Sequence, residues 1–404
     1  MRTEMLTWSH EHGWSGPFPP AVPGHTLVLA FGESALVDDP APLAELVAAY
    51  PGTAVTGCSG AGQFASVPRP VPGQGAAPGV RLDPAPLIVT VVMFDQVRVR
   101  IVAVRPGSRT SRQAGQELAE QRRPDDTALF VLSSGINVNG DQLTEGIVDG
   151  LARTRPAGAP ALPVSGGLAG AADGLPRTWV LAGRAPLLTA VVGVFLSGDA
   201  LQAGYGSAVG WGIFGPARRV TRSDGHVLYE VDGKPALALY KRYLGDRAAG
   251  LPATALLFPL GLHTEDGGEK IVRSILAVDE TAQSLTFAGD IPQGSTVELM
   301  RSTRDWLVDA AGTAAQNAAD DIGPAAGRGA GEPAEWLAIA VSCVARRLAL
   351  GERTEEELDA AFEGLAPNTT MTGFYSYGEI ALACGGRTRV HNQTMTVTVF
   401  GERQ

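Results

Sequence analysis

The sequence predicts an α/β protein built from two related domains, each with a mixed sheet flanked by helices. Short apolar runs typical of buried strands, such as Thr26–Phe31 and Leu187–Leu196, alternate with segments of helical spacing, such as Gly140–Thr154. The same order of elements then occurs a second time, with the glycine-containing motifs at Gly166 and Gly373 lying 207 residues apart. We therefore predict an internal duplication; a chance similarity between two generic α/β domains is the alternative.

The first predicted domain spans residues 25–205. Residues 1–24 precede it and lack periodicity, so we expect an arm there. Val97–Val104 alternates valine with arginine at its start, which is typical of a half-buried strand. The proline- and glycine-rich residues 65–86 predict a loop. The remaining expected elements are helices at Pro42–Tyr50 and Ser108–Gln121, strands at Ala128–Leu132 and Trp179–Leu181, and a tight turn at Gly57–Gly62.

The second predicted domain spans residues 216–400. Gly204–Pro216 leads into it, and the aromatic residues among its glycines predict a strand that crosses between the domains. Thr354 and Glu357 have the spacing of a capping box at a helix start, and residues 320–333 predict an exposed loop. The remaining expected elements are strands at Thr296–Met300 (the counterpart of 97–104), Trp336–Val341 and Met395–Phe400, and helices at Arg304–Asp321 and Thr354–Phe362.

The composition argues against several classes of protein. The 404-residue chain has 45% hydrophobic and 18% charged residues and a formal net charge of −10 without a basic stripe, so we expect no nucleic-acid partner. Its longest apolar runs have only strand length and its N-terminus lacks signal-peptide features, which predicts no membrane insertion. Cys58, Cys343 and Cys384 show neither disulfide nor zinc spacing, so we expect a cytoplasmic location.

Motifs for catalysis and metal binding are weak. Gly57–Gly62 and Gly166–Gly170 could present backbone N–H groups to an anion, but they lack the lysine of a phosphate-binding loop, and tight turns are the alternative. Cys343 and Ser165 are candidate nucleophiles without a G-x-S-x-G elbow. No H-E-x-x-H or H-x-x-x-H pattern occurs. We therefore expect no metal site and no enzyme, and keep an enzyme of unknown class as an alternative.

Residues 373–394 have the composition of a small-molecule pocket. Such pockets combine flat apolar walls with a few fixed polar groups, and this segment holds tyrosines, a carboxylate and amides among glycines. A pocket with both a carboxylate and a guanidinium suits an amino acid, whereas structural ion pairing is the alternative. The candidate ligand-binding residues are Tyr375 and Tyr377 as walls, Glu379, Arg346 and Asn392 as orienting groups, and Gly166 and Gly167 as points of close backbone approach.

The order of these motifs resembles the FIST family, which consists of bacterial sensory modules with a FIST N and a FIST C domain. The resemblance covers roughly residues 25–400, and its two most specific motifs are Val227–Leu237 and Gly373–Ile380. Two departures concern the loops: Gln63-Phe64 and Ala171-Ala172 stand where the family tends to have an acid. The other matching motifs are Gly57–Ser59, Ser133–Gly135, Gly166–Gly170, Ser342-Cys343 with Arg346, and His391–Thr394.

The resemblance implies a sensor of a small ligand, such as an amino acid or another small polar metabolite. FIST modules are coupled to kinases, cyclases or methyl-accepting proteins, and this sequence shows no output domain, so we expect it to act alone or through a separate partner of that kind. Some relatives look like haem-based nitric oxide sensors. Haem is therefore an alternative ligand, with His226, His263 or His391 as its axial residue.

Overall fold

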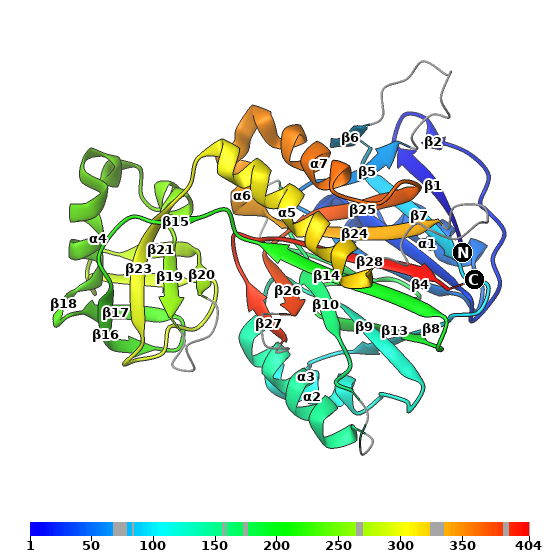
Figure 1. Cartoon of the computed structure of the whole chain (residues 1–404), viewed down its shortest axis with the longest axis horizontal. Helices are drawn as coiled ribbons and strands as arrows, with labels where there is room; N and C mark the ends of the chain where they lie inside the picture. Colours follow the sequence, from blue (N-terminus) through cyan, green and yellow to red (C-terminus); the bar gives the residue numbers. More distant parts are fainter. Residues whose placement is uncertain are drawn as a thin grey trace.

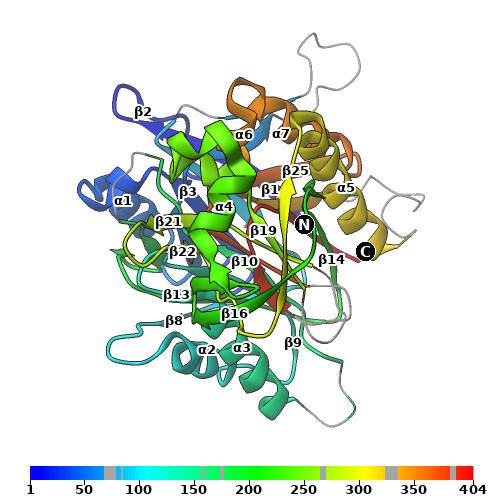
Figure 2. The same ribbon diagram turned by 90° about the vertical axis from the view of Figure 1, so that its left-hand side faces the viewer.

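A computed structural model shows a large body and a smaller domain that projects from one side of it (Figure 1). The predicted α/β class with mixed sheets is confirmed. The smaller domain, formed by residues 212–301, lies in front of the body in the view of Figure 2, and we call it the inserted domain. The structure describes residues 1–67, 79–82, 85–155, 158, 160–172, 177–263, 270–323, 335–382 and 388–403.

The body consists of three consecutive units of the same topology. The first contains β1 (Arg2–Ser9), β2 (Gly13–Trp14), β3 (Thr26–Gly32), η1 (Ser34–Val37), α1 (Ala41–Ala49), β4 (Ala54–Ser59), β5 (Gln63–Val67), β6 (Gly79–Leu82) and β7 (Leu87–Met93). The second contains β8 (Arg98–Val104), α2 (Ser111–Ala119), β9 (Asp126–Ser133), α3 (Gly140–Thr154), β10 (Val164–Leu168), β11 (Val180–Ala182), β12 (Pro186–Leu187) and β13 (Val191–Ser197). The third contains β14 (Leu201–Ala208), α5 (Arg304–Ile322), β24 (Trp336–Cys343), α6 (Val344–Leu350), η5 (Gly351–Arg353), α7 (Thr354–Glu363), β25 (Thr369–Ser376), β26 (Gly378–Leu382), β27 (Thr388–His391) and β28 (Met395–Glu402).

Each unit forms a sheet with the same strand order. The central pair is parallel, β3 with β4, β9 with β10 and β24 with β25, and two antiparallel strands follow on one side, namely β7 and β1, β13 and β8, and β28 and β14. On the other side each sheet receives a hairpin from a neighbouring unit. β5–β6 pairs with β25, β11–β12 with β4, and β26–β27 with β10. The exchange is cyclic, so the units close into a ring about a pseudo-threefold axis.

Three glycines occupy equivalent positions in the parallel strand pairs. Gly57, Gly166 and Gly373 lie in β4, β10 and β25, and a Cβ atom at each would stand 1.8, 1.9 and 1.9 Å from the carbonyl oxygen of the residue opposite on the neighbouring strand. Any side chain would therefore push the two strands apart. The duplication predicted from Gly166 and Gly373 is part of a threefold repetition, and Gly57 marks the third copy.

The carboxyl ends of the three parallel pairs meet at the axis. A ring of three backbone hydrogen bonds joins the segments that follow β4, β10 and β25, each unit donating to the next. These bonds satisfy main-chain groups at a point where each strand leaves its own sheet. They run from Ala61 N to Tyr375 O (2.8 Å), from Gly170 N to Ser59 O (2.8 Å) and from Tyr377 N to Leu168 O (3.2 Å).

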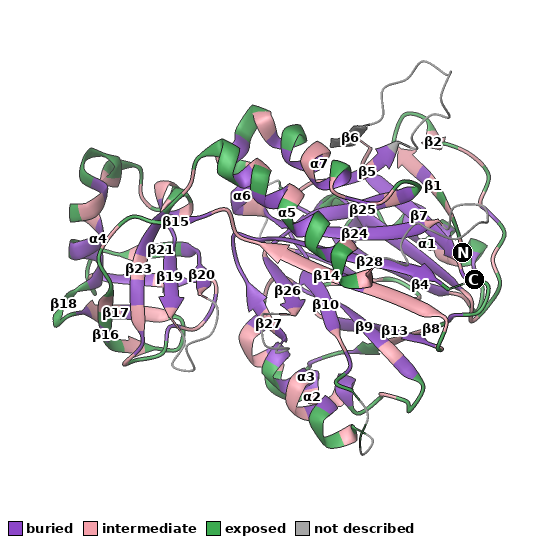
Figure 3. Cartoon of the chain, viewed as in Figure 1, coloured by how far each residue is buried: buried purple, intermediate pink, exposed green. Residues whose placement is uncertain are grey.

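The central core lies between the three sheets, and the helices cover their outer faces. Phe31, Phe130 and Phe374 come from different units and belong to one buried cluster, with the rings of Phe31 and Phe374 4.9 Å apart between centroids. Separate apolar clusters lie under α1, under α2 and α3, and under α5 and α7. Figure 3 shows that the strands in the middle of the body are almost entirely buried. Burial on both faces explains why their sequences are continuous apolar runs.

The inserted domain interrupts the third unit between β14 and α5 and has its own core. The predicted crossing strand at 204–216 is observed as β14 followed by β15. Gly204 and Gly206 let α5 approach β14, because a Cβ at either would lie 2.0 Å from a helix carbonyl oxygen. The domain contains β15 (Gly212–Ile213), β16 (Arg218–Asp224), β17 (Val227–Val231), β18 (Lys234–Pro235), α4 (Ala236–Leu244), η2 (Gly245–Gly250), η3 (Ala253–Leu257), β19 (Leu260–His263), β20 (Ile271–Arg273), β21 (Ile275–Asp279), β22 (Ser284–Phe287) and β23 (Thr296–Arg301).

Strands on either side of the predicted division between 25–205 and 216–400 share sheets, because β5 joins β25 and β26 joins β10. Residues 1–24 are not a free arm, since Arg2–Trp8 of β1 pair with β7 along their whole length. The predicted correspondence of 296–300 with 97–104 is also wrong. Thr296–Arg301 form β23 of the inserted domain, and β14 takes the place in its sheet that β8 takes in the second unit.

Two local predictions are wrong for identifiable reasons. Thr354 is no N-cap, because a turn of 3-10 helix precedes it and its hydroxyl donates to Gly351 O; Glu357 instead turns inward to Arg346. The loop predicted at 65–86 contains the end of β5 and the strand β6, which the exchanged hairpin requires. Most of residues 68–84, residues 324–333 of the second predicted loop, and Cys384 lie outside the described residues.

The substitution Gly373→Ala tests the close approach of β24 and β25. The added methyl would meet both Ala340 O and the ring of Phe64, at 2.6 Å, in a fully packed region, so we expect the free energy of unfolding to fall by roughly 3 kcal/mol. Gly312→Ala in α5 is the control, because its Cβ would lie at an ordinary contact distance, 3.4 Å, from Ala360 O of α7, and the change should add about 0.5–1 kcal/mol to stability. Urea unfolding measures both; equal effects would contradict the constraint.

Candidate functional site

A cavity of about 880 Å³ lies between the body and the inserted domain. On the body side it is formed by the segments that follow β4, β9, β10, β24 and β25, and on the other side by η3, β21 and the residues around them. The body contributes Ala61, Gly135, Ile136, Val138, Gly140, Leu168, Ala171, Ala172, Cys343, Val344, Ala345, Arg347, Leu348, Gly351, Thr354 and Tyr377, and the inserted domain contributes Leu256, Ser274, Leu276 and Ala288.

The topology explains this location. Parallel strands bring their carboxyl ends to one edge of a sheet, where connecting segments diverge and leave a crevice. Here three such edges converge because the hydrogen-bond ring holds them together at the axis. The inserted domain then covers the crevice, which makes the cavity an interdomain site of the kind that commonly holds small molecules.

Polar contacts hold the inserted domain over the crevice. The guanidinium of Arg273 makes two hydrogen bonds of 2.9 Å to the carboxylate of Asp141, at the start of α3, and donates to Val390 O at 3.2 Å. Where the chain enters the inserted domain, between β14 and β15, Trp211 Nε1 donates to Gln393 O at 3.1 Å, and Gln393 Nε2 donates to Leu256 O of the inserted domain at 2.8 Å. These contacts join the inserted domain to the body at α3, at β27 and at the segment before β28.

One of the seven predicted site residues, Tyr377, lines this cavity, and its hydroxyl donates to Ala171 O at 3.2 Å. Gly166 and Gly167 lie within β10, hydrogen-bonded between β9 and β26, where a Cβ on Gly167 would meet Val341 at 2.7 Å. Tyr375 is buried behind the cavity wall, against Phe64. Their contact with a ligand stays a prediction.

Arg346 is fully buried and its hydrogen bonds go to protein groups. Its Nε donates to Glu357 at 3.1 Å, Nη1 to Val209 O at 2.8 Å and Nη2 to Leu307 O at 2.7 Å. Ser342 Oγ donates to the same carboxylate oxygen of Glu357 at 2.7 Å. In this arrangement the guanidinium links α6, α7 and α5 to the strand that leads into the inserted domain.

Glu379 is also fully buried, next to Cys343. Ser376 Oγ donates to one carboxyl oxygen at 2.5 Å, and Thr394 donates to the other from N at 3.1 Å and from Oγ1 at 2.8 Å. Burial raises the pKa of Glu379 to about 7, because the charged form loses its water. Asn392 is buried nearby, and its Oδ1 has no hydrogen-bond partner in the described chain.

The candidate nucleophiles and haem ligands do not assemble into a reactive centre among the described residues. Burial and the neighbouring Glu379 raise the pKa of the Cys343 thiol, which opposes a thiolate. Ser165 Oγ is buried and has no hydrogen-bond partner in the described part of the chain. The candidate axial histidines are outside the cavity lining. His263 pairs with Glu298 at 2.6 Å, and burial lowers the pKa of His391 to about 4. The cavity residues therefore do not fit haem ligation by histidine.

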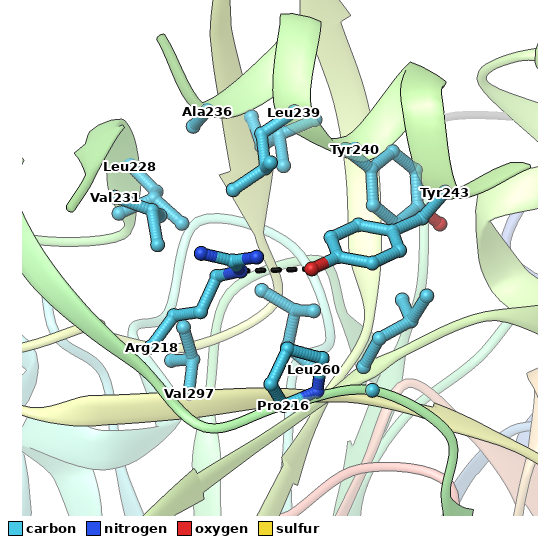
Figure 4. A pocket seen from close by; sticks show the side chains of 13 residues that line it. Pro216, Arg218, Leu228, Val231, Ala236, Leu239, Tyr240, Tyr243, Leu260 and Val297 are labelled. Atoms are coloured by element: carbon cyan, nitrogen blue, oxygen red, sulfur yellow. Dashed lines mark hydrogen bonds between the residues drawn. The ribbon is translucent and has the colours of Figure 1, made fainter. Parts of the chain in front are cut away.

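Two further cavities differ in character from the interdomain one. A cavity of about 40 Å³ lies inside the inserted domain among leucine and valine side chains, with the Arg218 Nε donating to Tyr243 Oη at 2.8 Å across it (Figure 4). Its volume suits a water molecule rather than a metabolite. Another, of about 500 Å³, also has walls from both domains, but it lies beside α3, away from the strand ends, and contains charged side chains of both signs, among them Arg112, Asp149 and the Asp141–Arg273 pair.

Sequence reasoning missed most of the cavity lining. Arg347 follows the residue that we had singled out, and only the structure shows that it is Arg347, not Arg346, that faces the cavity. Ser274, Leu276 and Ala288 belong to a domain whose sequence carries no motif at these positions. The signals available for the body wall are the motifs at the strand ends: Gly57–Gly62, Ser133–Gly135, Gly166–Gly170 and Ser342-Cys343 contribute Ala61, Gly135, Leu168 and Cys343 to the lining.

We expect Arg346→Met to lower the free energy of unfolding by about 3–5 kcal/mol, because Glu357 would remain buried without its charged partner. The double variant with Glu357→Met should recover part of this loss, since it removes both charges from the interior. Urea unfolding of the three proteins measures the effect. A change below about 0.5 kcal/mol for Arg346→Met, the size typical of surface substitutions, would show that the pair has no structural role.

Glu379→Gln should remove one pH-dependent contribution to stability. The folded state keeps a proton on Glu379 up to about pH 7, whereas the unfolded chain releases it near pH 4.3, so this contribution falls as pH rises between these values, by up to about 3 kcal/mol. Buried His391 acts in the opposite direction below pH 6.5, equally in both proteins. Urea unfolding of both proteins at pH 5.0 and 7.5 is the measurement; a difference that does not change with pH would contradict the shift.

Comparison with known families agrees with this architecture. Residues 26–234 match the FIST N domain and residues 236–382 match the FIST C domain, so the two matches meet inside the inserted domain, between β18 and α4. No curated protein matches the chain. Among the described residues, no helix is both long and apolar enough to cross a bilayer. Because the two matches cover nearly the whole chain, the protein belongs to the FIST family, whose domains are sensory modules of signal transduction.

Proposed function

We propose that this FIST protein senses a small molecule that binds in the cavity between the body and the inserted domain. The observation that carries the proposal is the cavity of about 880 Å³ at the converging strand ends, with walls from two separately packed domains. A ligand in such a site contacts both domains at once, so its binding energy depends on their relative position.

Ligand binding would change the position of the inserted domain relative to the body, and this change would be the signal. The inserted domain connects to the body through two adjacent strand crossings, near Val209 and Ser302. It also rests on the body through polar contacts such as Asp141–Arg273 and through a small apolar cluster that joins Val272 and Met300 to α5 and α6. Interfaces of this kind allow domain motion unless they are large and apolar. A ligand that favours the closed arrangement would shift the population towards it. A separate cytoplasmic signalling protein, such as a kinase or a cyclase, would then respond to the closed form.

The proposed role needs no catalytic step. The cavity lining combines apolar side chains with a neutral thiol, one arginine and three hydroxyl-bearing residues, namely Ser274, Thr354 and Tyr377. It offers no paired nucleophile and base among the described residues. Reversible binding is the chemistry that this set supports. We propose that the ligand contacts Tyr377, which the sequence had indicated, and also Arg347, Ser274 and Cys343.

A thermal-unfolding screen of amino acids, nucleotides and organic acids tests the proposal. A ligand at a hundred times its dissociation constant should raise the midpoint by about 3 °C. Ala288→Trp fills the cavity from the inserted domain and should abolish the shift, whereas Ala282→Trp, in an exposed turn of the same domain, should keep it. A compound that stabilises Ala288→Trp as much as the unaltered protein, or a screen without any shift, would contradict a ligand site in this cavity.

A further inference from the structure

Among the described residues that line the cavity of about 880 Å³, the one charged side chain is positive. Of the described lining residues, Arg347 alone is charged, and aspartate, glutamate and lysine are absent from the lining. Cys343 is neutral because burial raises the pKa of its thiol. The protein as a whole has a formal net charge of −10, so the charge of the described cavity lining is opposite to the net charge of the protein. An isolated positive charge in a recessed site favours the binding of an anionic ligand.

Arg347 has hydrogen-bonding capacity that the protein does not use. Its Nη1 donates to Ala61 O, and its guanidinium carbon lies 5.7 Å from the ring centre of Tyr375. The other N–H groups make no hydrogen bond, and no carboxylate pairs with it, within the described chain. By contrast, the adjacent Arg346 is bonded through all three nitrogens. A half-buried guanidinium with vacant donors suits a carboxylate, which accepts two parallel hydrogen bonds from it.

A second polar group lies on the opposite wall. Ser274, in the inserted domain, is 3% exposed and its Oγ has no hydrogen-bond partner in the described chain, although it lines the cavity. A buried hydroxyl without a partner costs free energy that a bound polar group would recover. The cavity therefore offers polar partners from both domains, which a ligand could use together.

The rest of the lining is apolar. It includes side chains of the body, among them Val138, Leu168 and Leu348, and side chains of the inserted domain, namely Leu256 and Leu276. Leu276 and Leu348 are 55% and 59% exposed in the described structure, so they leave apolar surface uncovered at this site. A ligand with an aliphatic or aromatic body would cover that surface.

We propose that the ligand is an amphipathic monocarboxylate, with its carboxylate bound by Arg347 and its apolar body against the leucine and valine side chains. This inference rests on the proposed function and narrows it. An amino acid would bury its ammonium group without a carboxylate partner in the described lining, because Glu379 lies behind the wall and is bonded to Ser376 and Thr394. A nucleotide would bring several negative charges to one arginine.

Matched compounds that differ only at the polar end test this inference by calorimetry at pH 7.5. One set is octanoate, octanamide, octylamine and 2-aminooctanoate; the other is 3-phenylpropanoate, its amide, its amine and phenylalanine. We expect a carboxylate of at least one set to bind about tenfold or more tighter than its three counterparts. The amide and the amine lack the carboxylate, and the amino acid adds an ammonium group that would be buried without a partner.

Three variants assign the effect to the cavity. Arg347→Met should weaken carboxylate binding by about tenfold to a hundredfold, while Arg242→Met, which removes an exposed arginine from α4, should leave it unchanged. Leu348→Glu alters an exposed side chain, so the fold should persist; the lost apolar contact affects both compounds, and the added negative charge should weaken the carboxylate more than the amide. Thermal unfolding without ligand confirms that each variant is folded.

Several results would overturn the inference. They are equal binding of the carboxylate and its amide, tighter binding of the amine or the amino acid, no binding of either carboxylate, or unchanged affinity in both Arg347→Met and Leu348→Glu. If another class of compound binds and Ala288→Trp abolishes its binding, the sensory proposal stands and the monocarboxylate alone is refuted. If Ala288→Trp leaves carboxylate binding intact, the site itself is refuted.

Discussion

The close approach of three parallel strand pairs is the constraint on which the rest of the structure depends. Gly57, Gly166 and Gly373 each place a backbone where any Cβ atom would overlap a carbonyl oxygen of the next strand. This approach brings the carboxyl ends of the pairs to the pseudo-threefold axis, where the segments bond to one another in a closed ring. The exchanged hairpins then prevent any unit from completing its sheet alone. The crevice at the axis follows from this convergence, and the inserted domain converts the crevice into a cavity.

The inserted domain lies next to the site because of where it enters the third unit. The connection between β14 and α5 emerges beside the crevice, and Arg346 holds both of its ends through Val209 O and Leu307 O. A buried ion pair at this place contributes more to the geometry of the crossing than to net stability. The crossing can therefore stay fixed while the contacts farther out, around Asp141 and Arg273, are made or lost. In this account a ligand acts by adding contacts that only the closed arrangement provides.

Local patterns predicted most of the strands and helices, because buried strands and amphipathic helices leave periodic signals at the scale of one element. The equivalence of Gly166 and Gly373 was visible for the same reason. The third copy at Gly57 was not, because the inserted domain makes the two spacings between the copies unequal and the hairpins pair across units. The site was harder to predict. A polar residue at a strand end can face a cavity, as Tyr377 does, or another buried segment, as Glu379 and Arg346 do, and sequence periodicity is the same in both cases.

Hydrogen exchange with and without the compound that gives the largest thermal shift tests the central claim most directly, because it reports which amides the ligand covers or fixes. The account predicts slower exchange on both walls together, at residues 135–140 and 343–354 of the body and at residues 274–288 of the inserted domain. Exchange in the outer helices α1 and α2 should not change. Protection confined to the body, or protection at the outer helices without any in residues 274–288, would contradict a ligand held between the two domains.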